Sequence, residues 1–371
     1  MFRFDLIEEH GGHEEVVLCT NKDAGLKAII AIHNTTLGPA LGGTRMWKYA
    51  NDEDALIDVL RLSKGMTYKA AAAGLNLGGG KAVIIGDSKK DKSEALFRAF
   101  GRYIESLNGR YFTAEDVGTD VNDMEFINME TRYVTGIDAS HGGSGDPSPF
   151  TAHGVYMGIK ASIKEKLKTE NLKGIRVAVQ GIGNVGRHLV EFLTKEKAIV
   201  TITDTDNEKL DKVATEFGAK IVGPNEIYSV DCDIFAPCAL GAVINDDTID
   251  KFKCPIIAGG ANNVLKEARH GDILKKKGIL YAPDYVINAG GLMNVYVELE
   301  GYSRERALNM TKGIYYNLLQ VFATSKKEDI PTNVAADHVA EARIAKIGKI
   351  KQSHLGRSNR NYNTLKIDTK N

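Results

Sequence analysis

The chain has 371 residues, and its 48 lysines and arginines balance 48 aspartates and glutamates. A chain longer than about 250–300 residues exceeds what one hydrophobic core usually supports, so we expect two domains. The balanced charge argues against a chain-wide basic surface for nucleic acid or for an anionic membrane. We therefore expect a small-molecule partner, with neither nucleic acid nor membrane.

The first ten residues, MFRFDLIEEH, contain no apolar signal core, and no run of about 18 apolar residues is present to cross a bilayer. These features favour a cytoplasmic protein. The four cysteines form no C-x-x-C pair and the nine histidines show no metal-ligand spacing. The sequence therefore predicts neither disulfides nor a metal site.

Residues 1–145 mix the patterns of strands and helices. The apolar runs VVLC, LKAIIAIH and KAVIIGD are typical of strands, whereas DEDALIDVLRLSKGMTYK and SEALFRAFGRYIESL have helical spacing. The sequence here predicts an α/β domain with its own core, in which Lys81 opens the strand KAVIIGD. The cluster of Gly, Ser and Pro in HGGSGDPSPF, residues 141–150, then indicates a domain boundary.

Residues 146–330 are expected to form a second domain, which opens with a helix from about Ala152 to Lys168. Strands then alternate with helices, at RVAVQG, AIVTITD, AKIVG, CDIFAP, PIIAGG and ILYAPD. Such alternation predicts a doubly wound parallel sheet of the α/β class. We expect residues 331–371 to form a helix that packs back on the first domain and a polar, disordered tail.

A dinucleotide-binding fingerprint follows the first strand of the second domain. RVAVQGIGNVGRHLVEFL matches G-x-G-x-x-G at Gly181, Gly183 and Gly186, between a predicted strand and a predicted helix. These glycines allow a tight turn, a close approach of the pyrophosphate and close packing of the helix on the strand. Asp204 ends the next strand about twenty residues on, where a carboxylate accepts the ribose hydroxyls. It would repel a 2′-phosphate, so the sequence favours NAD over NADP.

Two lysines, Lys69 and Lys81, flank a stretch that is almost entirely alanine and glycine, KAAAAGLNLGGGK. Two ammonium groups in one cleft depress each other's pKa, so that one can act as a base while the other binds an anion. We interpret the small residues as a close wall for a ligand. A phosphate-binding P-loop is excluded, because Leu75 and Ala82 replace the glycine and the hydroxyl that its pattern requires.

A second acidic segment, YFTAEDVG, sets Glu115 and Asp116 between small residues. A carboxylate beside a lysine would complete an acid and base pair. The alternative is that either residue caps a helix, which is a common role for such side chains. The residues alone leave both readings open.

Seven motifs together resemble the amino-acid dehydrogenases of the glutamate, leucine, phenylalanine and valine superfamily: KGMTYKAAAAGLNLGGGKAVI, TAEDVG, GDPSPFTAHGV, GIGNVG, CDIFAPCALG, IAGGANN and YAPDYVINAGG. The resemblance implies NAD-dependent oxidation of an L-amino acid to a 2-oxo acid and ammonium, with a Rossmann-type NAD domain. It implies that Lys81 activates the attacking water and that Asp116 shuttles a proton. Lys69 would hold the substrate carboxylate, helped by the backbone near Gly42 and Gly43.

The resemblance also assigns the remaining contacts. Residues near the substrate would be Leu41, Met66, Ala114, Thr135, Asn262, Asn288, Leu292 and Val295. Residues near the cofactor would be Thr151, Gly181, Ile182, Gly183, Asn184, Val185, Gly186, Asp204, Ala239, Leu240, Ala261 and Asn262. The family further implies a homo-oligomer, an octamer.

The side-chain pocket implied by the resemblance is apolar, so glutamate is expected to be a poor substrate. Ala114 matches the branched-chain enzymes, which favours leucine, valine and isoleucine, and their order is left open. Leu292 is more usual in the aromatic enzymes, so a phenylalanine or tryptophan dehydrogenase is one alternative. A non-catalytic NAD-binding protein is another, although the intact Lys69, Lys81 and Asp116 argue against it.

Overall fold

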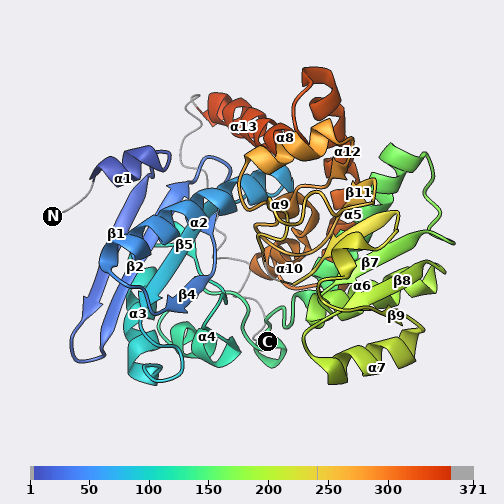
Figure 1. The fold of residues 1–371 in the computed structure, drawn as a ribbon. Coiled ribbons are helices and arrows are strands. Elements are labelled where there is room, and N and C mark those ends of the chain that lie inside the picture. The colour runs from blue at the N-terminus through green and yellow to red at the C-terminus, as the bar shows by residue number, and fades with distance from the viewer. Residues whose placement is uncertain (1–3, 240, 352–371) are drawn as a thin grey trace. The chain divides into compact units, whose positions relative to one another are not determined.

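The computed structural model describes residues 4–239 and 241–351 (Figure 1). The chain divides into two compact units, and each is described by itself. The first contains residues up to 146, residues 295–303 and residues from 340 onward, and the second contains residues 147–294 and 304–339. Leu240 and the polar tail from residue 353 lie outside the described residues.

The first unit is built on a mixed sheet in the order β1-β2-β5-β3-β6, with β4 paired to β5. Its strands are β1 (Glu15–Asn21), β2 (Leu26–Asn34), β3 (Ala40–Leu41), β4 (Thr44–Trp47), β5 (Gly78–Ile85) and β6 (Tyr111–Phe112). The pairs β1-β2 and β2-β5 are antiparallel, whereas β3 and β4 run parallel to β5.

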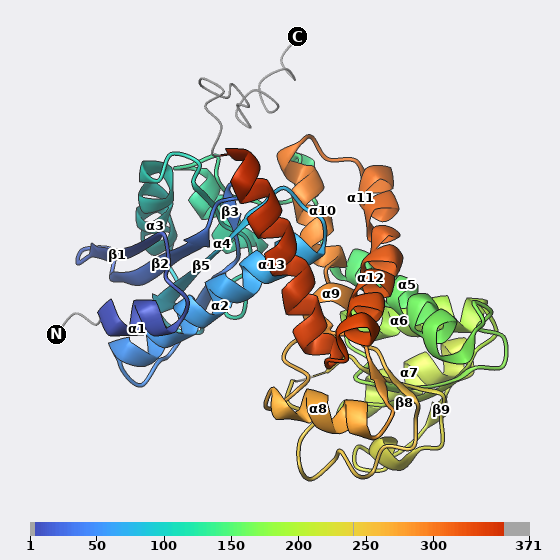
Figure 2. The same ribbon diagram turned by 90° about the horizontal axis from the view of Figure 1, so that it is seen from above.

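The helices of this unit are α1 (Phe4–Glu9), α2 (Asp52–Ala72), α3 (Glu94–Ser106), α4 (Val121–Asn128) and the short η1 (Ala139–His141). Figure 2 shows α1 and α2 on one side of the sheet and α3 on the other. Ile29 and Ala31 of β2 pack with Val59 and Leu60 of α2 in one buried cluster. Successive strand residues point to opposite faces, so Ile30 faces the other side and is also fully buried.

The second unit contains a parallel sheet in the order β12-β11-β10-β7-β8-β9. Its strands are β7 (Arg176–Gln180), β8 (Ile199–Thr203), β9 (Lys220–Ile221), β10 (Ile234–Pro237), β11 (Ile256–Ile257) and β12 (Leu280–Tyr281). Its helices are α5 (Ser148–Leu167), α6 (Asn184–Lys195), α7 (Asn207–Phe217), η2 (Ile227–Ser229), α8 (Arg269–Lys276), α9 (Asp284–Ile287), α11 (Arg304–Thr311) and α12 (Gly313–Glu328). The predicted α/β class with a doubly wound parallel sheet is confirmed.

Two helices contribute residues to both units, α10 (Gly290–Leu299) and α13 (Thr332–Lys351). In the first unit, Arg343 of α13 donates to the Leu75 carbonyl at 2.6 Å, and the hydroxyl of Tyr68 donates to Glu341 at 2.7 Å. The sequence analysis placed one C-terminal return near residue 331. The structure instead has residues 295–303 and then residues from 340 in the first unit.

Two element boundaries differ from the expected ones. Strand β5 begins at Gly78 rather than at Lys81, so the three glycines belong to the strand, where glycine marks a close approach of another backbone. Helix α5 begins at Ser148 rather than Ala152, because proline is tolerated in the first turn of a helix. No helix in the described ranges, 4–239 and 241–351, is long and apolar enough to span a membrane.

Candidate active site

A buried ion pair joins Lys81 and Asp116. The Nζ of Lys81 lies 3.0 Å from Oδ2 of Asp116, and Lys81 is only 5% exposed. Thr44 of β4 pairs with Ala82 on one side and with Glu115 on the other, so strand register brings the two segments together. Glu115 itself is exposed, and the carboxylate that meets the lysine is Asp116.

The surroundings shift both ionisation equilibria. Burial lowers the pKa of Lys81, and the attraction of Asp116 opposes this only in part. Burial raises the pKa of Asp116, but Lys81 and Arg45 outweigh it, so the pKa of Asp116 ends below its ordinary value. The pair therefore combines a firmly ionised carboxylate with an amine that releases its proton more readily than a lysine in water.

Arg45 is a third member of this site that the sequence analysis missed. Its Nε donates to Oδ2 of Asp116 at 2.9 Å, and its Nη1 donates to Asp58 at 2.9 Å. The available signal was local: Arg45 follows the glycine pair at 42–43 and precedes the fully buried Met46 in a short strand. Its partners at 58 and 116 are distant in sequence, so no spacing pattern connects them.

The glycines around Lys81 are required by packing. A Cβ on Gly79 would lie 2.1 Å from the Thr67 nitrogen, and one on Gly80 would lie 2.7 Å from the Tyr111 ring. A Cβ on Gly42 would lie 1.8 Å from the Gly80 carbonyl oxygen. Protein atoms therefore already occupy the space into which side chains at these positions would extend, and the close wall for a ligand stays a prediction.

Gly43 joins the same framework, since a Cβ there would lie 2.9 Å from the Cβ of Asp116. Met66 and Lys69 lie three residues apart on α2 and so share a face of that helix. The Cγ of Met66 lies 3.3 Å from the position that a Cβ of Gly42 would take. The first unit thus brings α2 and the glycine pair of the β3–β4 connection close to the strand that carries Lys81.

The predicted pocket residues divide between the two units. Leu41, Met66, Ala114, Thr135 and Val295 belong to the first, and Asn262, Asn288 and Leu292 belong to the second. Leu41, Ala114, Thr135 and Leu292 are buried. The hydroxyl of Thr135 donates to the Thr113 carbonyl at 3.0 Å, so its hydrogen-bonding capacity is directed to the backbone.

In the second unit, each glycine of the fingerprint has a separate physical role. Gly181 has φ +89°, and a Cβ there would lie 2.6 Å from that of Ala239. A Cβ on Gly186 would lie 2.0 Å from the Gly181 carbonyl oxygen, whereas Gly183 faces open space. Gly183 precedes α6, where no described side chain caps the helix, so the amides of its first turn can bind a pyrophosphate.

Asp204 lies beside this loop. Its Oδ2 accepts from the Ile182 nitrogen at 2.8 Å, and its Oδ1 accepts from the Asp206 nitrogen at 3.1 Å. It also lines a hollow of about 470 Å³ with Thr205, Asn207, Leu210, Ile221, Val222, Gly223, Pro224 and Glu226. These described lining residues include no lysine or arginine, and the residues present fit the adenosine end of a nicotinamide dinucleotide.

The predicted neighbours of the nicotinamide lie on two further segments of this unit. The Nδ2 of Asn288 donates to Oδ1 of Asn262 at 2.7 Å. A Cβ on Gly290 would lie 2.1 Å from the Phe150 carbonyl oxygen, and one on Gly291 would lie 2.8 Å from the Thr151 hydroxyl. This glycine pair, which was not named as a site in the sequence analysis, lets the N-termini of α5 and α10 meet.

Comparison with known proteins identifies the family. Residues 13–133 match the family model "Glu/Leu/Phe/Val dehydrogenase, dimerisation domain", and residues 142–208 and 205–357 match "Glutamate/Leucine/Phenylalanine/Valine dehydrogenase". The chain belongs to this dehydrogenase family. It is an amino-acid dehydrogenase, as the sequence predicted, and the family uses a nicotinamide cofactor.

The sequence identity of the chain to named relatives differs between the branches of the family. The chain is 60% identical to leucine dehydrogenase of Geobacillus stearothermophilus, over 92% of this chain and 94% of that one. It is 48% identical to phenylalanine dehydrogenase of Thermoactinomyces intermedius, over 94% and 96%. The crystal structure of L-tryptophan dehydrogenase from Nostoc punctiforme matches with a TM-score of 0.84 at 47% identity, over 93% and 99%. The leucine reading is favoured over the aromatic one.

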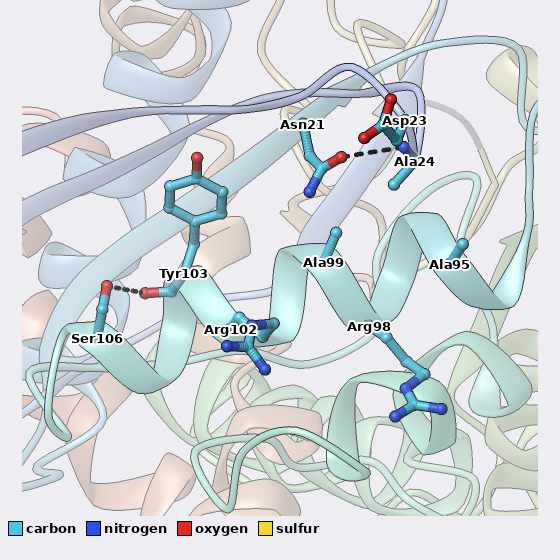
Figure 3. A pocket seen from close by; sticks show the side chains of 9 residues that line it. All are labelled: Asn21, Asp23, Ala24, Ala95, Arg98, Ala99, Arg102, Tyr103 and Ser106. Carbon is cyan, nitrogen blue, oxygen red and sulfur yellow. Dashed lines mark hydrogen bonds between the residues drawn. The ribbon is translucent and has the colours of Figure 1, made fainter.

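Two other features of this dehydrogenase have the general form of a binding site. A hollow of about 610 Å³ lies between the β1–β2 turn and α3 (Figure 3). Its cations, Arg98 and Arg102, point away from Asp23 in the figure, and both pair with Glu130. Both arginines are thus already engaged in ion pairs, and the described lining residues of the hollow include none of the predicted site residues.

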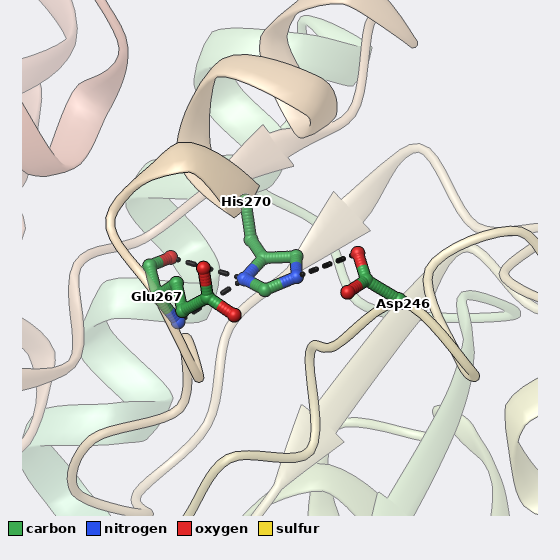
Figure 4. A group of neighbouring side chains, drawn as sticks. All are labelled: Asp246, Glu267 and His270. Atoms are coloured by element: carbon green, nitrogen blue, oxygen red, sulfur yellow. Dashed lines mark hydrogen bonds and ion pairs between the residues drawn. The ribbon is translucent and has the colours of Figure 1, made fainter.

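The second feature is the group Asp246, Glu267 and His270 (Figure 4), whose ligand atoms lie close enough together to hold a metal ion. Arg269 donates to Asp246 at 2.6 Å and to Glu267 at 2.7 Å, which balances both carboxylates. His270 is fully buried, and its two ring nitrogens face the Glu267 backbone and Asp246. This is a salt-bridge network, and it gives no reason to place a metal here.

Proposed function

We propose that the chain catalyses the reversible, NAD-dependent oxidative deamination of L-leucine, and also of L-valine and L-isoleucine, to the 2-oxo acid and ammonium. The observation that carries this proposal is the buried pair of Lys81 and Asp116, with Lys81 5% exposed and 3.0 Å from the carboxylate. Such a pair can exchange protons with an amine and a water. The 60% identity to a leucine dehydrogenase supports the choice of substrate.

In the proposed mechanism, Lys69 and the backbone near Gly42 and Gly43 hold the substrate α-carboxylate. The nicotinamide ring supplies the hydride acceptor. Asp116 takes a proton from the substrate amine, and the neutral Lys81 removes a proton from the water that attacks the imino carbon. Burial of Lys81 supports this assignment, because it lowers the pKa of the amine toward the working pH.

The substrate side chain is proposed to meet an apolar surface that includes Leu41, Met66 and Ala114. None of these can balance a side-chain carboxylate, which supports the exclusion of glutamate. Leu292 is the one residue that favours an aromatic substrate. One methylene changes discrimination by only about 1–3 kcal/mol in such a pocket, so the three branched substrates are expected to be used together.

NAD is proposed over NADP because of Asp204. Its carboxylate lines the hollow beside the fingerprint, where a 2′-phosphate would meet like charge. Arg187, which could have offset this charge, instead donates to both carboxylate oxygens of Glu216 at 2.8 and 2.9 Å. We further propose a homo-oligomer, an octamer, for which the matching "dimerisation domain" is the support; light scattering after size exclusion tests this.

The function is tested with purified protein, NAD and each of leucine, valine, isoleucine, phenylalanine and tryptophan at alkaline pH, by absorbance at 340 nm. Leucine is expected to give NADH fastest. Lys81→Ala should remove turnover and keep NAD binding, whereas Lys89→Ala, in the exposed turn after β5, should change neither. Absence of NADH with all five amino acids would refute the proposal, and a higher kcat/KM for phenylalanine would assign the chain to the aromatic branch.

A further inference from the structure

Arg45 shares one oxygen atom with the proposed base. The Nζ of Lys81 and the Nε of Arg45 both contact Oδ2 of Asp116, at 3.0 and 2.9 Å. The side chains of Arg45 and Asp116 are each 22% exposed, so water screens this group only weakly. Two cations therefore compete for the same carboxylate oxygen.

The guanidinium is held in place from its other end. Asp58 of α2 accepts from Nη1 of Arg45 at 2.9 Å, and the same oxygen accepts from the Tyr49 hydroxyl at 2.7 Å. Arg61 donates to the second Asp58 oxygen at 2.9 Å. This fork geometry needs a planar group with several fixed donors, which arginine has and lysine lacks.

The charge balance of the site indicates what Arg45 does. When Lys81 loses its proton, Asp116 stays paired with Arg45, so no uncompensated carboxylate is left in a largely buried site. If Arg45 were absent, the neutral Lys81 would leave Asp116 without a cation, and the lysine would hold its proton more tightly. Arginine suits this role because it keeps its charge at every working pH.

We propose that Arg45 is a positioning residue that sets the proton affinity of the pair formed by Lys81 and Asp116, and thereby lets Lys81 work as a base. This inference rests on the proposed function of that pair. The groups that act on Lys81 are Asp116 after β6, Arg45 on β4 and Asp58 on α2. Asp116 and Asp58 raise the pKa of Lys81, and Arg45 lowers it, in the direction that the proposal requires.

Two tyrosines also face this group, from the segment after β4 and from β6. Burial raises the pKa of Tyr49 and of Tyr111, so both stay neutral when Lys81 titrates. They contribute hydrogen bonds, to Asp58 and to the Gly42 carbonyl respectively, and no charge. The charge that faces the lysine therefore comes from Asp116, Asp58 and Arg45, and Arg45 is the cation among them.

The test compares the pH profile of kcat/KM for leucine deamination in the wild type and in Arg45→Gln. We expect the midpoint of the acidic limb to rise by about one pH unit, so that kcat/KM at a pH below the midpoint falls by up to about tenfold. Arg45→Lys keeps the charge, so its midpoint should return to within about 0.5 unit even if kcat falls. Arg98→Gln is the matched control: Arg98 also contacts two carboxylates, Glu94 and Glu130, and should leave the profile unchanged.

A second readout does not depend on turnover. The ε-carbon shift of Lys81 in ¹³C-labelled protein, assigned by its absence in Lys81→Arg, reports the pKa of the amine directly and should rise in Arg45→Gln. The chain's one tryptophan, Trp47, lines the same hollow as Arg45, so its fluorescence checks that β4 remains folded.

An unchanged midpoint and an unchanged Lys81 titration in folded Arg45→Gln would overturn the proposal, whether activity fell uniformly or stayed intact. If the wild type made no NADH from any amino acid, the proposed function would fail. The NMR titration would then still decide whether Arg45 controls the proton affinity of Lys81.

Discussion

Replacing Lys81 with methionine should remove most of the activity while it leaves the stability of the fold unchanged or slightly raised. Lys81 is almost fully buried, and removing an ammonium from such a place recovers a desolvation cost of several kcal/mol. The attraction lost with Asp116 at 3.0 Å is about 5–6 kcal/mol at an effective dielectric constant of about 20. The two contributions nearly cancel, and methionine adds apolar burial at a similar volume.

Whether the free energy of unfolding rises or falls depends on Asp116, the carboxylate that loses Lys81 as a partner. In Lys81→Met, Asp116 keeps its hydrogen bond to Arg45 at 2.9 Å, so no isolated carboxylate remains. We expect the free energy of unfolding at pH 8 to lie within about 1 kcal/mol of the wild-type value, unchanged or slightly higher. The turnover number should fall by about 10²–10⁴, which is typical for loss of a general acid or base.

Asp116→Asn is the informative counterpart. It leaves Lys81 and Arg45 close together with no carboxylate between them. We therefore expect the free energy of unfolding to fall by about 3 kcal/mol and the activity to be lost. Urea unfolding followed by circular dichroism gives both free energies, and absorbance at 340 nm gives the rates. A Lys81→Met protein that unfolds about 3 kcal/mol more easily, or that still turns over leucine at more than a tenth of the wild-type rate, would refute the reasoning.

Three further predictions follow from separate contacts. Gly79→Ala should lower the free energy of unfolding by about 1–3 kcal/mol or more and remove most activity, because its Cβ would lie 2.1 Å from the Thr67 nitrogen. Gly65→Ala, where a Cβ would meet no atom of another segment within 4 Å, should raise the free energy of unfolding by about 0.5–1 kcal/mol. Thermal unfolding distinguishes the two variants. Burial lowers the pKa of His33 to about 4, so the folded state binds fewer protons than the unfolded chain between pH 6.5 and 4, and stability falls as the pH falls through this window. Between pH 7 and 5 the wild type should lose about 2 kcal/mol more than His33→Asn in urea titrations, and equal losses would contradict this. Asp204→Asn should raise the ratio of kcat/KM for NADP over NAD at least about tenfold, since the amide oxygen can still accept from the Ile182 nitrogen while the like charge is gone; an unchanged ratio would place the cofactor preference elsewhere.

Local features of this chain were predictable because their causes are local in sequence. The alternation of strands and helices after residue 146 reflects periodic burial, and the turn at Gly181 reflects a left-handed backbone that only glycine adopts easily. The prediction that Lys81 belongs to the site also came from its immediate neighbours in the sequence. The choice between Glu115 and Asp116 did not, because adjacent residues share the same sequence context and differ only in the direction of their side chains.

What the amino-acid sequence by itself determined is therefore the class of fold and the dinucleotide fingerprint, and it also pointed to the lysine around which we propose that the chemistry is built. Only the tertiary structure showed that Arg45 binds Asp116, and that Thr67 and Tyr111 occupy the space beside the glycines of β5. Both facts depend on strand register and on the packing of α2 against β5, which bring together residues tens of positions apart. Periodicity and motif spacing report what a residue's neighbours in the chain require, whereas a charge balance among distant residues exists only once the chain has folded.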